Sequence, residues 1–198
     1  MKTSSFPRTT LLLAACAIIL GSASSGIAAV ESDERISHTQ STPDVDIWEI
    51  HCPNVKQSVT AYKQILFRHL DLITIEAGGG VQTGGVGKTW KLYVDPRGPN
   101  SGKLYHGLIR IPKGPNPTYP KSPTVKDMVR IQDVIKKGQK LKFTDSKDDS
   151  LEPTHLVLGY EDDGYSDNGY WGHDDGTGNQ CKGVGPAWLK ITIEHQKN

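Results

Sequence analysis

The sequence predicts an all-β fold, an antiparallel β-sandwich with at most one or two short helices. Short runs of alternating apolar and polar residues recur along the chain, as in "ITIEA" (73–77) and "WLKITIE" (188–194). This period-two alternation is typical of strands that bury one face. Glycine- and proline-rich stretches at 78–88, 95–102, 112–123 and 161–186 separate the runs. This arrangement favours a sandwich whose loops carry the function.

The N-terminal segment has the pattern of a secretory signal peptide. Lys2 and Arg8 precede an apolar run over 11–20, and small residues follow through Ala29. The run is too short to span a membrane, and a small-residue zone is where such peptides are cleaved. We therefore expect residues 1–29 to be removed and the protein to be secreted. The stretch "LAAC" (13–16) also spells a lipoprotein box, which leaves lipidation of Cys16 as an alternative.

After cleavage, the sequence predicts a leader and one domain. Residues 30–43 are polar without periodicity and are predicted to be a disordered leader. Residues 44–198 have the length of a single β-sandwich domain. Short helices are compatible with the residue spacing in 58–66 and in 124–139. Strands are predicted over 45–51, 70–77, 104–111, 140–143, 155–160 and 187–194.

Charge and motifs exclude several partner classes. Loss of 1–29 removes Lys2 and Arg8 from 23 basic residues and none of the 22 acidic ones, so the net charge changes from +1 to −1. We therefore expect neither a nucleic acid nor a membrane as partner. The stretch "TGGVGKTW" (83–90) lacks the first glycine of a phosphate-binding loop and runs towards Pro96 without room for a helix, so no nucleotide site is predicted.

Cys52 and Cys181 are the two cysteines of the mature chain. In an oxidising compartment such a pair indicates a disulfide first. The bridge would close a long loop and stabilise the fold by roughly 4–5 kcal/mol. A metal-ligand or reactive-thiol role is the weaker alternative, because neither cysteine lies in a Cys-x-x-Cys or Cys/His cluster.

The segment "YEDDGYSDNGYWGHDDGTGNQC" (160–181) is rich in carboxylates, amides and glycines. Ca²⁺ takes about six to eight oxygen ligands from such groups and from main-chain carbonyls, and glycine lets the chain bend around the ion. The Asp-x-x-x-x-Asp-Asn spacing from Asp162 to Asn168 can supply such ligands, although it does not match an EF-hand loop. A solvated acidic loop with turn-forming side chains explains the same composition equally well.

Two stretches resemble the LecA-like family of calcium-dependent galactophilic lectins. The first is "DLITIEAGGGVQTGG" (71–85), and the second is Asp-x-x-x-x-Asp-Asn-Gly (162–169), followed by "AWLKITI" (187–193). The resemblance implies a galactose-binding-like sandwich that holds Ca²⁺. The implied ligands are the main-chain carbonyls of Thr83 and of Gly164 or Tyr165 and the side chains of Asp162, Asp167 and Asn168. Unlike the family, this chain has a shorter Asp162–Asp167 span, an insertion over 170–186, and no alignable sugar-contacting His and Gln.

A sugar site combines an aromatic platform with polar side chains. Each candidate also has a structural alternative, since a loop tryptophan often covers the edge of a core and a histidine beside an apolar strand is often structural. The resemblance implies galactose as the ligand, with glucose, mannose or a non-sugar ligand left open. The candidates are Asp163, His106, Tyr165, Tyr170 and Trp171, and the wider set of residues considered adds Trp90, Tyr93, Tyr105 and His173.

These observations predict a secreted, calcium-dependent, lectin-like carbohydrate-binding protein. One alternative is a secreted interaction module with a structural calcium ion and no sugar site. A hydrolase is the other: a carboxylate pair such as Asp163 and Asp174 could act as glycosidase acid and base. The chain has no Gly-x-Ser-x-Gly motif, and no residue set meets the requirements of a catalytic site. We therefore assign no catalytic residue.

Overall fold

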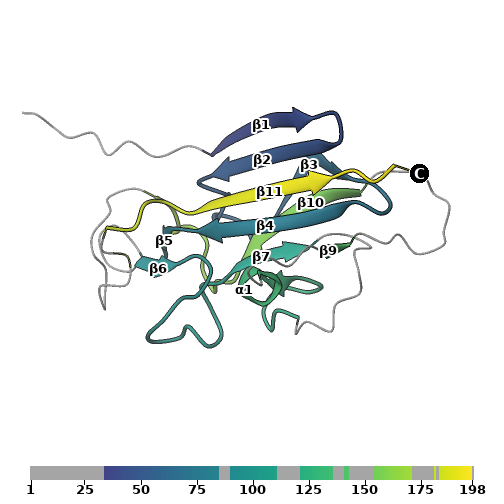
Figure 1. Cartoon of the computed structure of the whole chain (residues 1–198). Helices are drawn as coiled ribbons and strands as arrows, with labels where there is room; N and C mark the ends of the chain where they lie inside the picture. Colours follow the sequence, from purple (N-terminus) through teal and green to yellow (C-terminus); the bar gives the residue numbers. More distant parts are fainter. Residues whose placement is uncertain are drawn as a thin grey trace, which may run out of the picture.

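The computed structural model describes residues 34–84, 90–110, 121–135, 141–142, 154–170, 181 and 183–197. The predicted signal peptide lies outside them. Two antiparallel sheets pack face to face, and a short two-stranded ladder lies at one end (Figure 1). The predicted all-β sandwich is therefore confirmed.

The first sheet has the strand order β1-β2-β11-β4-β9. Its strands are β1 (Arg35–Thr42), β2 (Val45–His51), β11 (Trp188–Glu194), β4 (Leu72–Gly78) and β9 (Leu141–Lys142). All its pairings are antiparallel. Strand β11, the last along the described chain, lies between β2 and β4.

The second sheet has the order β3-β10-β7-β8. Its strands are β3 (Val59–Phe67), β10 (Thr154–Tyr160), β7 (Gly107–Arg110) and β8 (Val129–Arg130). The helix α1 (Ile131–Val134) follows β8, and β5 (Gly80–Gln82) pairs with β6 (Trp90–Leu92) in the separate ladder. Within the described part of the chain, no helix is long and apolar enough to cross a membrane.

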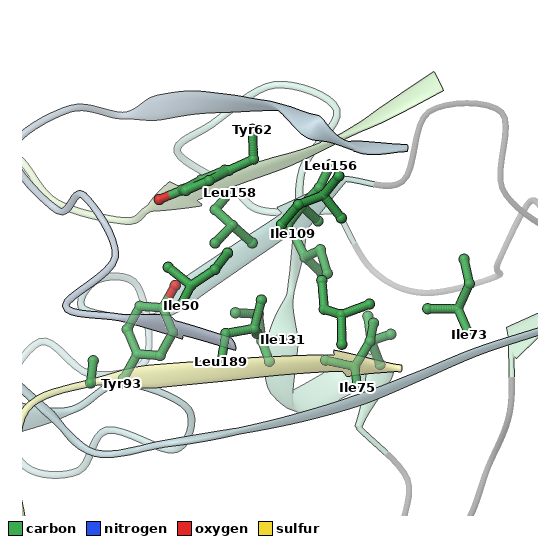
Figure 2. Packing of buried hydrophobic residues seen from close by; sticks show 14 of the residues in the cluster. Ile50, Tyr62, Ile73, Ile75, Tyr93, Ile109, Ile131, Leu156, Leu158 and Leu189 are labelled. Atoms are coloured by element: carbon green, nitrogen blue, oxygen red, sulfur yellow. The ribbon is translucent and has the colours of Figure 1, made fainter. Parts of the chain in front are cut away.

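The core lies between the two sheets and follows the predicted alternation. Leu189, Ile191 and Ile193 of β11 are fully buried, whereas the residues between them are only partly so. Ile73 and Ile75 of β4 point to the same side. Burying each such side chain contributes about 1.5–3 kcal/mol. Figure 2 shows Leu189 and Ile75 across the core from residues of the second sheet, namely Tyr62, Ile109, Leu156 and Leu158. Ile50 of β2 lies beside Leu189 in the first sheet.

The structure differs from the sequence expectation at residues 35–42, which belong to the predicted disordered leader. They form β1, which pairs with β2 over its whole length. All eight side chains are exposed, so main-chain hydrogen bonds hold this strand more than core burial does. Two side-chain contacts add to them, because His38 stacks on Trp48 at a centroid distance of 4.1 Å and meets Asp46 at 3.0 Å.

The helix considered over 58–66 is also corrected, because residues 59–66 belong to β3. The β3–β10 pairing jumps from Leu66↔His155 to Tyr62↔Leu156, which is a register irregularity. Through this shift, Tyr62 and Ile65 are both buried although they are three residues apart. A spacing of three is what an amphipathic helix shows, so the irregularity accounts for the wrong expectation.

One end of the sandwich brings together segments that are far apart in the sequence. Gly78 of β4 lies opposite Trp188 of β11 at this end, and β5 follows directly. Isolated bridges then join Gly80 to Pro186 and Gln82 to Gly169. The acidic loop that follows β10 is thus attached to the ladder of β5 and β6.

Candidate cation and ligand site

Main-chain hydrogen bonds position the acidic loop against β5. Gln82 donates its N–H to the carbonyl of Gly169 at 2.9 Å, and Gly169 donates to the carbonyl of Gln82 at 3.0 Å. In an antiparallel pair, the next two opposed residues are then Thr83 and Asn168. Both are buried, with exposed fractions of 6% and 0%. Two of the predicted calcium ligands therefore lie side by side.

Asp162 is a buried carboxylate at the start of the same loop. Its Oδ1 accepts hydrogen bonds from the N–H groups of Asp163 at 2.7 Å and Gly164 at 3.3 Å. Its Oδ2 is buried and has no hydrogen-bond partner. Burial raises the pKa of Asp162 to about 6, although the N–H groups and the side chain of Asn168 favour the charged form. The Asp162 carboxylate is therefore shielded from water, one of its oxygens receives no hydrogen bond, and it lies next to Asn168.

The side-chain oxygen of Asn168 is a second buried acceptor at this place that receives no hydrogen bond. Asn168 Nδ2 donates to the carbonyl of Val55 at 3.0 Å, which fixes the orientation of the amide. Its Oδ1 is buried and unpartnered. Leaving a buried acceptor unsatisfied costs about 1–3 kcal/mol. Two such oxygens on neighbouring side chains fit a hard cation, which binds carboxylate and amide oxygens.

The described residues contain no group of three or more His, Cys, Asp or Glu side chains that could hold a metal ion. A cation here would therefore depend on the amide oxygen of Asn168 and on main-chain carbonyls as well as on Asp162. Asp167, Asp163 and Gly164 are exposed. Of the predicted ligands, Thr83, Asp162 and Asn168 are buried and Asn168 contacts the Asp162 carboxylate, whereas Asp167 and Gly164 lie at the surface.

His106, predicted to contact sugar, has a structural position instead. It is 3% exposed, and its Nδ1 lies 2.9 Å from Oε2 of the fully buried Glu161. Arg130 Nε contacts the same oxygen at 2.9 Å, and Ser122 donates to Oε1. Burial alone would raise the pKa of Glu161, but these partners outweigh it and lower the pKa. The Nδ1 atom of His106 therefore faces this buried network.

Tyr165 and Tyr170, two further sugar candidates, also direct their hydroxyls inward. Tyr170 donates to the carbonyl of Pro53 at 2.7 Å, and Tyr165 donates to the carbonyl of Tyr160 at 3.1 Å. Both rings pack against the core. Trp171 lies outside the described residues. Among the sugar candidates within the described chain, only Asp163 is exposed to solvent.

The structure shows no disulfide between Cys52 and Cys181, and both side chains are buried. Cys52 donates its main-chain N–H to Ala187 at 2.9 Å. Cys181 packs against Gly80, where a Cβ would come within 2.9 Å of the sulfur. Burial raises the pKa of the Cys181 thiol to about 11, although Lys91 acts in the opposite direction. At neutral pH this thiol is protonated and unreactive.

One residue of this end was missed by the sequence prediction. Gln82 is fully buried, and both polar atoms of its amide lack a partner. Tyr105, one of the aromatic residues considered for sugar binding, donates its main-chain N–H to the carbonyl of Glu161 at 2.6 Å. Both residues approach the acidic loop only through the tertiary fold.

The chain was compared with family models, curated proteins and solved structures. Nothing in the three comparisons matches it.

Proposed function

We propose that this chain is a secreted, calcium-dependent carbohydrate-binding protein. One observation carries the proposal: Asp162 Oδ2 and Asn168 Oδ1 are buried and have no hydrogen-bond donor. The two side chains are adjacent, since Asn168 contacts the Asp162 carboxylate. A bound Ca²⁺ would satisfy both oxygens, together with the carbonyl of Thr83 from the neighbouring segment.

Calcium also supplies a way to hold a sugar. A hard cation completes its oxygen shell with neutral hydroxyls as readily as with water. The exposed carboxylate of Asp163, next to Asp162, can then accept a hydrogen bond from a hydroxyl of the same sugar. Such charge-assisted bonds are stronger than neutral ones. Galactose is the ligand that the resemblance to the LecA-like family implies.

A structural calcium ion without a sugar site is the second candidate. The inward orientation of His106, Tyr165 and Tyr170 favours it, because these side chains leave little of the predicted aromatic platform. Both candidates have the same calcium site, and the second differs only in that it binds no carbohydrate. Measurements of calcium binding and of sugar binding therefore distinguish the two candidates.

The first measurement is the melting temperature in millimolar CaCl₂ and in EDTA. A ligand that binds only the native state stabilises it by about 2.7 kcal/mol at a hundredfold excess over Kd. The second is a glycan array with and without EDTA. A melting temperature indifferent to calcium contradicts both candidates. Calcium-dependent melting with a silent array leaves the structural ion alone.

A further inference from the structure

Tyr105 has an unusual backbone conformation at the edge of the candidate site. Its φ is 75°, and Asn100 in the same loop has a φ of 64°. Residues other than glycine rarely adopt this left-handed region, and a bulky side chain is a particular exception. Such conformations persist when the surrounding structure enforces them, and they cluster at ligand sites.

Main-chain hydrogen bonds enforce the position of Tyr105. Its N–H donates to Glu161 at 2.6 Å, and Glu161 in turn donates to His106 at 3.0 Å. These bonds continue the β7–β10 pairing beyond its last pair, Gly107↔Tyr160. Because the chain continues from Glu161 to Asp162, Tyr105 is fixed beside the buried carboxylate.

The ring of Tyr105 is held on one side by Lys91. The Lys91 ammonium lies 5.4 Å from the ring centroid and donates to the carbonyls of Arg97 at 2.9 Å and Pro99 at 3.4 Å. The hydroxyl of Tyr105 hydrogen-bonds with the side chain of Asn100. A ring fixed in this way loses little conformational entropy when a ligand packs on it.

The main chain of Tyr105 is joined to Glu161, the residue that precedes the acidic side chains of the loop. Burial raises the pKa of the Tyr105 hydroxyl despite the contact with Asn100, and the charges of Asp162, Asp163 and Asp167 add to the rise. The ring is half-buried and packs in part against the core, as the rings of Tyr165 and Tyr170 also do. By contrast, Tyr93 and Tyr160 are buried in the core and stack on each other.

We propose that Tyr105 is the aromatic wall of the ligand site beside Asp162, against which the apolar C–H face of a pyranose packs. The inference rests on the proposed carbohydrate-binding function. The sugar bridges the ring of Tyr105 and the carboxylate of Asp163, with the cation at Asp162 and Asn168 below it. Tyr105 thereby replaces His106, Tyr165 and Tyr170 as the aromatic contact of the site.

The test compares Tyr105→Asn with Tyr105→Phe in the full mature chain. Asparagine tolerates a left-handed backbone better than most residues, so Tyr105→Asn removes the ring without adding strain. Tyr165→Phe is the control for loss of a hydroxyl, because Tyr165 is a half-buried tyrosine of the acidic loop whose hydroxyl bonds inward to the carbonyl of Tyr160. Calcium binding is measured by calorimetry with CaCl₂. Sugar binding is measured in excess calcium with methyl galactoside, methyl glucoside and methyl mannoside.

We expect Tyr105→Asn to weaken sugar binding by about tenfold or more, while its calcium affinity stays within about threefold of wild type. Tyr105→Phe and Tyr165→Phe should bind sugar within about threefold of wild type. Unchanged sugar binding by Tyr105→Asn overturns the role of Tyr105 alone. Loss of calcium binding in this variant also overturns it, since the ring would then support the cation loop. Wild-type protein that binds none of the three glycosides overturns the proposed function and this role together.

Discussion

The imidazole of His195 lies with Nδ1 2.9 Å from the carboxylate of Asp71, which is 1% exposed. The other ring nitrogen, Nε2, lies 3.0 Å from Asp46. Asp46 in turn meets His38 at 3.0 Å. This chain of contacts connects the β1–β2 hairpin with the residue before β4 and the residue after β11. It therefore fastens the open edge of the first sheet to its centre.

We expect His195→Gln to lower the free energy of unfolding by about 1.5–3 kcal/mol near neutral pH, because hydrogen bonds to charged groups are lost. Burial alone would lower the pKa of His195, but the bonds to Asp46 and Asp71 outweigh burial and the charge of Arg68, and raise it. The contribution is thus complete below about pH 6.5 and is lost as the pH rises through the raised folded-state pKa.

Denaturant unfolding of wild type and His195→Gln at a series of pH values checks this dependence. The difference between them should shrink at alkaline pH. His51→Gln is the matched control. His51 is largely exposed, and its contact with Glu49 is long, at 3.9 Å. A His195 effect that grows with pH contradicts the expected sign.

Asp162→Asn should have opposite effects with and without calcium. In EDTA at neutral pH we expect the variant to be as stable as wild type or more so, because the folded-state pKa of Asp162 is raised to about 6 and its ionisation therefore opposes folding. In millimolar calcium the variant should lack the roughly 2.7 kcal/mol of ligand stabilisation expected at a hundredfold excess over Kd.

Melting curves of Asp162→Asn and of the neighbouring exposed Asp163→Asn, recorded in both buffers, separate these effects. Asp163→Asn should keep most of the calcium response, since the two buried oxygens proposed to bind calcium belong to Asp162 and Asn168 and not to the exposed Asp163. Equal calcium responses in wild type and Asp162→Asn would place the cation elsewhere.

The affinity for calcium should fall in acid. A proton competes with the cation for the Asp162 carboxylate, whose pKa is raised to about 6 by burial. Below that pH the apparent affinity should drop about tenfold per pH unit as this one carboxylate protonates. Calcium titrations by calorimetry between about pH 5 and 7.5 measure the slope. A flat profile over this range would show that Asp162 is not a ligand.

Glu161→Gln should destabilise the protein by about 3 kcal/mol or more, because it leaves the Arg130 guanidinium beside a fully buried site uncompensated. Arg130 Nε lies 2.9 Å from Glu161 Oε2. Chemical denaturation measures the loss. Glu76→Gln is the control: the Glu76 side chain is 56% exposed and 3.7 Å from Lys190, so its removal should cost at most about 1 kcal/mol. Similar costs for both would contradict a structural role for Glu161.

Much of the fold could be predicted because period-two alternation is local. The predicted strand 45–51 coincides with β2, and the strand 187–194 is β11 within one residue. Strand β1 was missed because its eight side chains are all exposed, so the sequence carries no burial pattern there. Strand β3 was obscured because the register irregularity at Leu66 and Tyr62 changes the spacing of its buried residues.

The candidate site was predictable in part for a similar reason. Asp162 and Asn168 lie six residues apart in one loop, and their buried oxygens belong to a segment that the sequence itself marks as acidic. The direction of a side chain is set by packing across strands. His106 therefore turned out to face Glu161, and Tyr105 reached the loop through main-chain bonds that no motif encodes.

The place of β11 in the first sheet has a consequence for the order of folding. Strands β2 and β4 each pair with β11 and not with one another. The first sheet therefore cannot be completed until Trp188–Glu194 is available to pair with both strands. Contacts between such distant segments form slowly. The packing of the two sheets against each other is therefore expected to be a late and slow step of folding.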